Sequence, residues 1–141
     1  MSVAQIMTSR VVSVSMDDSL ATLQELFHTT GFHHLIVVEQ HEIRGIISDR
    51  DLLKAISPFI GTYNERDKDR ATLSRKAHQI MTRKVLTVRP EDTIVSAIRA
   101  FNQHKISCLP VVDAHQRPVG IISWRDILRY AEDLVNLRKR Q

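Results

Sequence analysis

Cysteine is nearly absent, with Cys108 the single one among 141 residues. An internal disulfide is therefore excluded, and a lone thiol fits a reducing cytosol. Cys108 lies in the apolar run 108–112, where we expect a small buried side chain. No apolar run approaches the roughly 20 residues of a membrane helix, and residues 1–10 lack the apolar stretch of a signal peptide. These absences predict a cytoplasmic protein without a membrane partner.

Charge of one sign is not concentrated anywhere. Lys and Arg number 20 against 16 Asp and Glu, for a formal net charge of +4 at pH 7. The basic residues are scattered and lack interleaved aromatic residues, so we do not expect a nucleic-acid partner. The 7 histidines form no spaced ligand cluster, and no activated nucleophile stands out. The sequence therefore predicts neither a metal site nor an enzyme.

What the chain does contain is a repeat. The tripeptide Ile-Met-Thr at 6–8 recurs at 80–82, and Gly-Ile-Ile-Ser at 45–48 recurs at 120–123. Each Gly-Ile-Ile-Ser is followed, after one variable position, by Arg-Asp. One extra residue in the second copy, near 116–118, explains a small shift between the two motifs. Matches in the same order and context indicate a genuine internal repeat.

Each copy predicts a strand, a helix, two strands and a second helix. The short alternating segments 11–14 and 85–88 indicate the first strands. The first helix is clearest in the second copy, where apolar residues recur at helical spacing. These residues are Ile94, Ala97, Ile98 and Phe101. Two runs rich in β-branched residues then predict buried strands separated by a polar turn. These runs are 35–38 and 43–47 in the first copy, and 109–112 and 119–122 in the second.

The repeat divides the chain into four parts. We expect repeat one at 1–57, an inter-repeat linker at 58–78, repeat two at 79–134 and a basic C-terminal tail at 135–141. The linker is long for a connection within a compact domain, and its mixed charges predict a solvated loop or a short exposed helix. The last helix continues towards Leu137, and the basic residues after it suit a helix C-terminus.

A strand–helix–strand–strand–helix unit that ends in Gly-apolar-apolar-Ser-x-x-Asp resembles the CBS domain. The resemblance covers nearly the whole chain except the linker and the tail. It implies a mixed α/β (α+β) fold in which two βαββα repeats pack with pseudo-twofold symmetry and enclose two clefts. We therefore expect a stand-alone CBS pair, or Bateman module, whose regulated target is a separate and unknown protein.

The repeated serine and acid suit a nucleotide. Ser48 and Ser123 fall where a strand gives way to a helix, whose N-terminus offers unpaired N–H groups to a phosphate. Asp51 and Asp126 lie in the first helical turn, and a carboxylate can accept both hydroxyl hydrogens of a ribose. Matching residues in nucleotide-binding CBS proteins have these roles. A capping box explains the same residues without a ligand, and the two roles are compatible.

The two copies differ beside this motif. His33 aligns with Ser107, and it resembles the phosphate-contacting histidines of AMP-activated protein kinase gamma subunits. Asp49 aligns with Trp124, and its charge would repel a polyphosphate. We expect two unequal sites, of which the one with His33 is better suited to a phosphate.

The candidate ligand-binding residues form two sets. The first set is His33, Ser48 and Asp51. The second set is Ser107, Ser123 and Asp126. The resemblance implies that side chains around the adenine come from the opposite copy. For the first set these are Ile80, Val85 and Ile106. For the second set they are Ile6, Val11 and Phe32. Plain core packing is the alternative for each of the six.

Together these residues predict a non-catalytic regulatory module that binds an adenine nucleotide and modulates a separate protein. The resemblance implies AMP, ADP, ATP or S-adenosylmethionine as the ligand, with no cofactor required. It also implies a homodimer, because CBS pairs commonly form disc-like dimers through their helices. The alternative is a ligand-free protein-interaction or dimerisation module.

Overall fold

The computed structural model describes residues 1–140, which fall into two compact units. The Asp51 unit comprises Val12–Val85. The Asp126 unit comprises Met1–Val11 together with the chain from Leu86 onward. The opening segment therefore packs with the second copy of the repeat, and the corresponding segment after the linker packs with the first.

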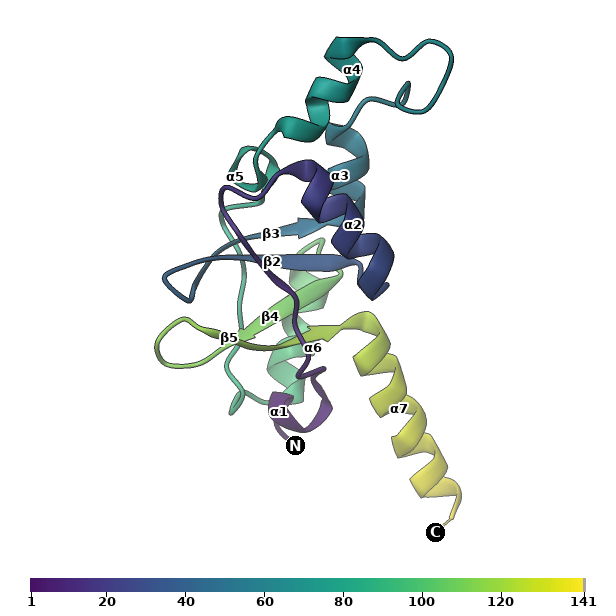
Figure 1. Cartoon of the computed structure of the whole chain (residues 1–141). Coiled ribbons are helices and arrows are strands. Elements are labelled where there is room, and N and C mark those ends of the chain that lie inside the picture. Colours follow the sequence, from purple (N-terminus) through teal and green to yellow (C-terminus); the bar gives the residue numbers. More distant parts are fainter. Residues whose placement is uncertain (141) are drawn as a thin grey trace. The chain divides into compact units, whose positions relative to one another are not determined.

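The Asp51 unit is built on a three-stranded sheet in the order β1-β2-β3, of which β2 and β3 are labelled in Figure 1. β1 (Ser13–Ser15) runs parallel to β2 (His34–Glu39), which pairs antiparallel with β3 (Glu42–Ser48). Helices α2 (Leu20–Thr30) and α3 (Asp49–Ala55) pack against this sheet and against each other. The buried core of this unit consists of Val14, Leu20, Leu23, Leu35, Val37, Ile47, Leu52, Ala77 and Met81. The apolar runs of the first copy are thus strands, as predicted.

The Asp126 unit has a smaller sheet of two antiparallel strands, β4 (Cys108–Val112) and β5 (Pro118–Ser123). Helix α6 (Ile94–Gln103) buries Ile94, Ala97 and Phe101 of the predicted inner face, whereas Ile98 is half-buried. Helix α7 (Trp124–Lys139) follows β5 directly. The buried core consists of Val3, Val88, Ala97, Phe101, Leu109, Val111 and Ile122.

The strand predicted at 85–88 is wrong. In the first copy the amide of Ile36 donates to the carbonyl of Val12 at 3.0 Å, next to the β1–β2 ladder. Pro110 occupies the matching position in β4, and proline has no N–H to donate. Only a bridge at Val88 remains. One proline therefore reduces a third strand to a single pairing.

Two short helices that were not predicted precede the repeated Met-Thr pairs. They are α1 (Val3–Ile6) and α5 (Ala77–Ile80). After α1, Thr8 pairs with Ile121 of β5 through two hydrogen bonds of 2.8 Å. After α5, Thr82 pairs with β3 in the same way. Each sheet is thus extended by a segment from the other copy of the repeat.

The glycine of each Gly-Ile-Ile-Ser motif makes room for these segments. A Cβ atom at Gly120 would lie 2.5 Å from Met7 Sδ and 3.0 Å from the carbonyl oxygen of Thr8. A Cβ atom at Gly45 would lie 2.5 Å from Met81 Sδ and 3.0 Å from the carbonyl oxygen that follows it. The Ile-Met-Thr and Gly-Ile-Ile-Ser motifs therefore occur together because the Met-Thr pair of one copy packs on the glycine of the other.

The linker contains a short helix, α4 (Asp67–Ala71), and a 3₁₀ helix, η1 (Thr72–Ser74). The short-helix alternative for this segment is therefore confirmed. Before α4 the chain forms a turn whose Tyr63 is fully exposed.

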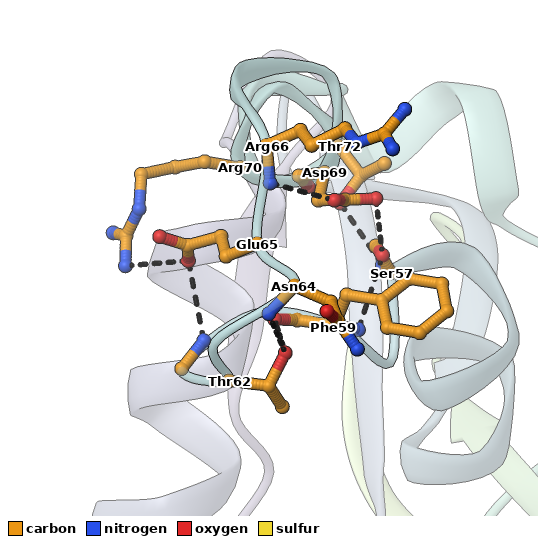
Figure 2. A network of polar contacts seen from close by, with 10 residues as sticks. Ser57, Phe59, Thr62, Asn64, Glu65, Arg66, Asp69, Arg70 and Thr72 are labelled. Carbon is orange, nitrogen blue, oxygen red and sulfur yellow. Dashed lines mark hydrogen bonds and ion pairs between the residues drawn. The ribbon is translucent and has the colours of Figure 1, made fainter.

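A polar network holds the linker in place (Figure 2). Asp69 is buried, and its carboxylate accepts hydrogen bonds of 2.8 Å from the Ser57 hydroxyl and from the Arg66 amide. These bonds lower the pKa of Asp69 below its ordinary value. The Thr72 hydroxyl donates to the Asp69 carbonyl at 2.6 Å and accepts from the Ser57 amide at 3.1 Å. The linker is an ordered element rather than a simple spacer.

Most of the predicted basic tail is the end of α7, which runs to Lys139 with Arg140 as its C-cap. Gln141 lies outside the described residues. Among residues 1–140 no helix is both long and apolar enough to cross a membrane.

Candidate functional site

In both units the repeated serine and aspartate join a strand to a helix. Ser48 caps α3: its Oγ accepts from the Asp51 amide at 3.1 Å, and Asp51 Oδ2 accepts from the Ser48 amide at 2.9 Å. Ser123 and Asp126 form the same reciprocal pair at the start of α7, at 3.4 and 2.9 Å. Both motifs are therefore capping boxes, which fixes the position of each carboxylate.

The two aspartates differ in what else they contact. Asp126 is only 4% exposed; its Oδ1 accepts from the Thr8 hydroxyl at 3.3 Å and lies 3.7 Å from Arg129 Nη1. Its Oδ2 also accepts from the Ser123 hydroxyl at 3.2 Å. Asp51 is half-buried, and within residues 1–140 its Oδ1 receives no hydrogen bond. Asp51 therefore has an oxygen available to a ligand, whereas both oxygens of Asp126 are engaged.

His33 contacts Asp49, which lies between Ser48 and Asp51 in the sequence. Its exposed ring places Nδ1 2.9 Å from Asp49 Oδ2, and its carbonyl accepts from the Asp49 amide at 3.0 Å. Partial burial acts to raise the pKa of Asp49, but the hydrogen bond with His33 outweighs it together with smaller contributions, so the pKa lies below its ordinary value. Asp49 is consequently ionised at neutral pH, and the first set contains two carboxylates.

Trp124 occupies the position of Asp49 in the second set. Its indole N–H donates to the Ile106 carbonyl at 3.0 Å, and its ring meets Phe101 edge-on at a centroid distance of 6.2 Å. Its amide donates to the Ser107 carbonyl at 3.4 Å. An apolar ring thus stands where the first set has a negative charge.

The six apolar side chains predicted to surround the adenine are all half-buried. Ile80 and Val85 share a unit with the first set, and Ile6 and Val11 share a unit with the second. Ile106, which was expected to face the first set, belongs to the Asp126 unit. Phe32, which was expected to face the second set, belongs to the Asp51 unit. Those that pack against a core are Ile6, Ile80 and Ile106.

Two further residues of the second set were not predicted. Arg129 follows Asp126 by three positions on α7, so helical spacing was a readable signal. Thr8 belongs to the repeated Ile-Met-Thr motif, but its contact depends on the opening segment packing with the other copy. Sequence spacing alone does not reveal that exchange.

Comparison with known proteins identifies the family. The CBS domain matches residues 3–58 and 77–133. CBSX2, whose sequence comes from Arabidopsis thaliana, has been solved in complex with AMP; it matches with a TM-score of 0.78 and 26% identity, over 94% of this chain and 97% of that chain. The CBS domain pair of protein MJ0100, solved in complex with 5′-methylthioadenosine and S-adenosyl-L-methionine, matches with a TM-score of 0.77 and 25% identity, over 94% of this chain and 97% of that chain.

The match to the homoserine O-acetyltransferases covers only part of those proteins. The homoserine O-acetyltransferase of Methanococcoides burtonii is 35% identical over 129 residues, which are 91% of this chain and 24% of that protein. The chain thus spans about a quarter of the length of the homoserine O-acetyltransferases it matches. With two matched regions that cover most of its length, the chain belongs to the CBS domain family.

Proposed function

We propose that this chain is a non-catalytic regulatory module that binds an adenine nucleotide and modulates a separate protein. The ligand is AMP, ADP, ATP or S-adenosylmethionine. The observation that carries the proposal is the Asp51 carboxylate, which is fixed by its cap yet keeps Oδ1 open. The complexes of two similar CBS proteins with adenosine ligands support it.

Each residue of the first set has a role suited to its chemistry. Asp51 accepts the ribose hydroxyl hydrogens, because an ionised carboxylate is a pure acceptor. The Ser48 hydroxyl and the His33 ring contact the 5′ group. Ile80 and Val85 pack on the adenine ring, whose flat apolar faces suit half-buried aliphatic side chains.

The second set takes the same ligand class more weakly. Ser107, Ser123 and Asp126 stand in the matching positions, with Ile6 and Val11 in the same unit. A ligand here must displace the Thr8 hydroxyl from Asp126 before its ribose can bind.

We propose no catalytic role for any residue. Burial raises the pKa of the Cys108 thiol to about 12, so the thiolate that a nucleophilic cysteine needs does not form at neutral pH. The carboxylates of both sets are occupied as helix caps rather than paired for acid–base work. The acetyltransferase names belong to proteins about four times as long as the matched region.

Homodimerisation is part of the proposal. Helix α7 leaves Leu134, Val135 and Leu137 exposed at 44%, 53% and 56%. These residues give the helix an apolar stripe among charged neighbours, which is the kind of surface that pairs with another helix. The proposal also includes a separate regulated protein, which the resemblance implies, and a cytoplasmic location, which fits the single cysteine.

Calorimetric titration with AMP and with S-adenosylmethionine tests the nucleotide proposal. The parent is compared with the double variant Asp51→Asn, Asp126→Asn, since asparagine still caps a helix but lacks the charge. We expect the double variant to melt near the parent and to bind about 10- to 150-fold more weakly, the loss of a hydrogen bond to a charged group. Asp67→Asn removes an exposed carboxylate from α4 and is the matched control.

Two outcomes contradict the proposal. If the parent takes up none of AMP, ADP, ATP and S-adenosylmethionine, the chain is the ligand-free interaction module instead. If the double variant binds as tightly as the parent, the aspartates are caps alone.

A further inference from the structure

The first set carries more negative charge than the second. Asp49 and Asp51 lie two positions apart, and Asp49 is hydrogen-bonded to the His33 ring. In the second set Trp124 replaces Asp49, and Arg129 lies 3.7 Å from the one carboxylate. The two sets therefore present different charges to the same kind of ligand.

From this difference we infer that Asp49 is a specificity-determining residue of the first set. It makes that set prefer adenosine ligands whose 5′ group carries at most one phosphate over diphosphates and triphosphates. The inference rests on the proposed nucleotide binding and goes beyond it by naming the ligand class.

The position of the 5′ group follows from the chemistry around Asp51. The ribose hydroxyls take the open Oδ1, and the adenine takes the aliphatic side chains. What remains for the 5′ group is the polar side formed by His33, Ser48 and Asp49, which hydrogen bonds hold together. Further phosphates attached to the 5′ group would lie near the Asp49 carboxylate.

His33 can serve only one phosphate. Its Nδ1 is committed to Asp49 at 2.9 Å, so Nε2 is the ring atom left for a ligand. A single imidazole nitrogen makes one hydrogen bond. The second and third phosphates of ATP would add negative charge beside the Asp49 carboxylate, and like charges at this range repel.

The size of the discrimination follows from Coulomb's law. ATP carries about two more negative charges than AMP, and each interacts with Asp49 across roughly 8 Å of largely aqueous medium. We expect Asp49 to disfavour ATP relative to AMP by about fivefold, which corresponds to about 1 kcal/mol. Salt weakens the effect, because this distance is close to the Debye length.

Calorimetry with AMP, ATP and 5′-methylthioadenosine tests the inference. All proteins carry Asp126→Asn, which weakens the second set and keeps its helix cap. Asp49→Asn is compared with Asp49 intact, and Asp67→Asn is the control for net charge because it lies on the exposed side of α4. We expect Asp49→Asn to raise the ratio of ATP affinity to AMP affinity about fivefold and to change the affinity for 5′-methylthioadenosine, which has no phosphate, less than about twofold.

The outcomes separate this inference from the proposed function. If AMP and 5′-methylthioadenosine bind but Asp49→Asn leaves the ATP-to-AMP ratio unchanged, Asp49 does not select the ligand. If Asp49→Asn weakens all three ligands equally, its role is only to position His33, and the inference also fails. If none of the three binds the parent, the proposed function itself is wrong.

Discussion

The Asp51 and Asp126 units carry the same motif and the same helix cap, yet they leave their aspartates in different states. In one, Asp51 keeps an oxygen open and has a second carboxylate beside it. In the other, Asp126 is buried and contacts Thr8 and Arg129 as well as its own cap. The repeated motif fixes the backbone and the cap, and neighbours outside the motif decide what the carboxylate can do. Two copies of one motif can thus differ in whether the second oxygen of the aspartate is free to bind a ligand.

The largest expected effect concerns the glycines that both units share. Gly45→Val and Gly120→Val place side chains against a methionine and a backbone carbonyl, so the crossing segment must move. We expect each to lower the free energy of unfolding by about 2–3 kcal/mol, as for other overpacked sites. Urea denaturation measures this, and a variant as stable as the parent would contradict the packing of Met7 or Met81 on its glycine.

The two aspartates should differ in their contribution to stability. Asp126→Ala leaves the Thr8 hydroxyl and the Ser123 amide without a partner in a buried place, and we expect a loss of about 2 kcal/mol. Asp51→Ala removes only a helix cap at a half-buried place, and we expect about 1 kcal/mol. Thermal and urea unfolding of the two variants side by side measure the difference. Equal losses would mean that the additional contacts of Asp126 contribute nothing.

Substitution of Thr8 tests whether its hydroxyl competes with a ligand for Asp126. Thr8→Val removes the hydroxyl that donates to Asp126 Oδ1, at a cost of about 0.5–1 kcal/mol in stability. We expect AMP to bind the second set more tightly in this variant, and fluorescence of Trp124, the single tryptophan, reports on it. Thr82→Val is the matched control, because Thr82 holds the same repeat position and donates no hydrogen bond to Asp51. An equal change of AMP affinity in Thr8→Val and Thr82→Val would contradict competition by the Thr8 hydroxyl.

His34 and Cys108 occupy the same position in the two repeats. Their ionisation has the smallest expected effect on stability at neutral pH. Burial lowers the pKa of His34 and raises that of Cys108 to about 12, so both side chains are uncharged at neutral pH. Because the folded-state pKa of the thiol is raised, its contribution to stability is complete below the unfolded-state pKa of about 9 and is lost as the pH rises towards 12. We expect thiol reagents at pH 8 to label Cys108 only as fast as the protein unfolds, and rapid labelling of the folded protein would contradict its burial.

Much of the architecture could be predicted because local signals agree. The doubled Gly-Ile-Ile-Ser motif, the β-branched runs and the helical spacing of α6 each indicate the element that the structure contains. The capping boxes of Ser48 and Ser123 were likewise readable from serine and acid three positions apart. The strand at 85–88 was predicted although the structure lacks it, because Pro110 removes a hydrogen bond from its partner strand at a distant position in the sequence.

The site was less predictable because its contacts join distant parts of the chain. That Thr8 donates to Asp126 depends on the opening segment packing with the second copy, which spacing does not reveal. The His33–Asp49 contact also crosses from the start of β2 to the end of β3. Residue types indicated which groups belong to a site, and the pairing of strands decided which of them meet.

A two-site calorimetric titration with AMP tests the inequality of the two units most directly. The parent is compared with Asp51→Asn and with Asp126→Asn, each of which keeps its helix cap. We expect Asp51→Asn to weaken the tighter binding event by about 10-fold or more, and Asp126→Asn to change that event by less than about twofold. Equal losses in the two variants, or a greater loss in Asp126→Asn, would contradict the inequality of the two units.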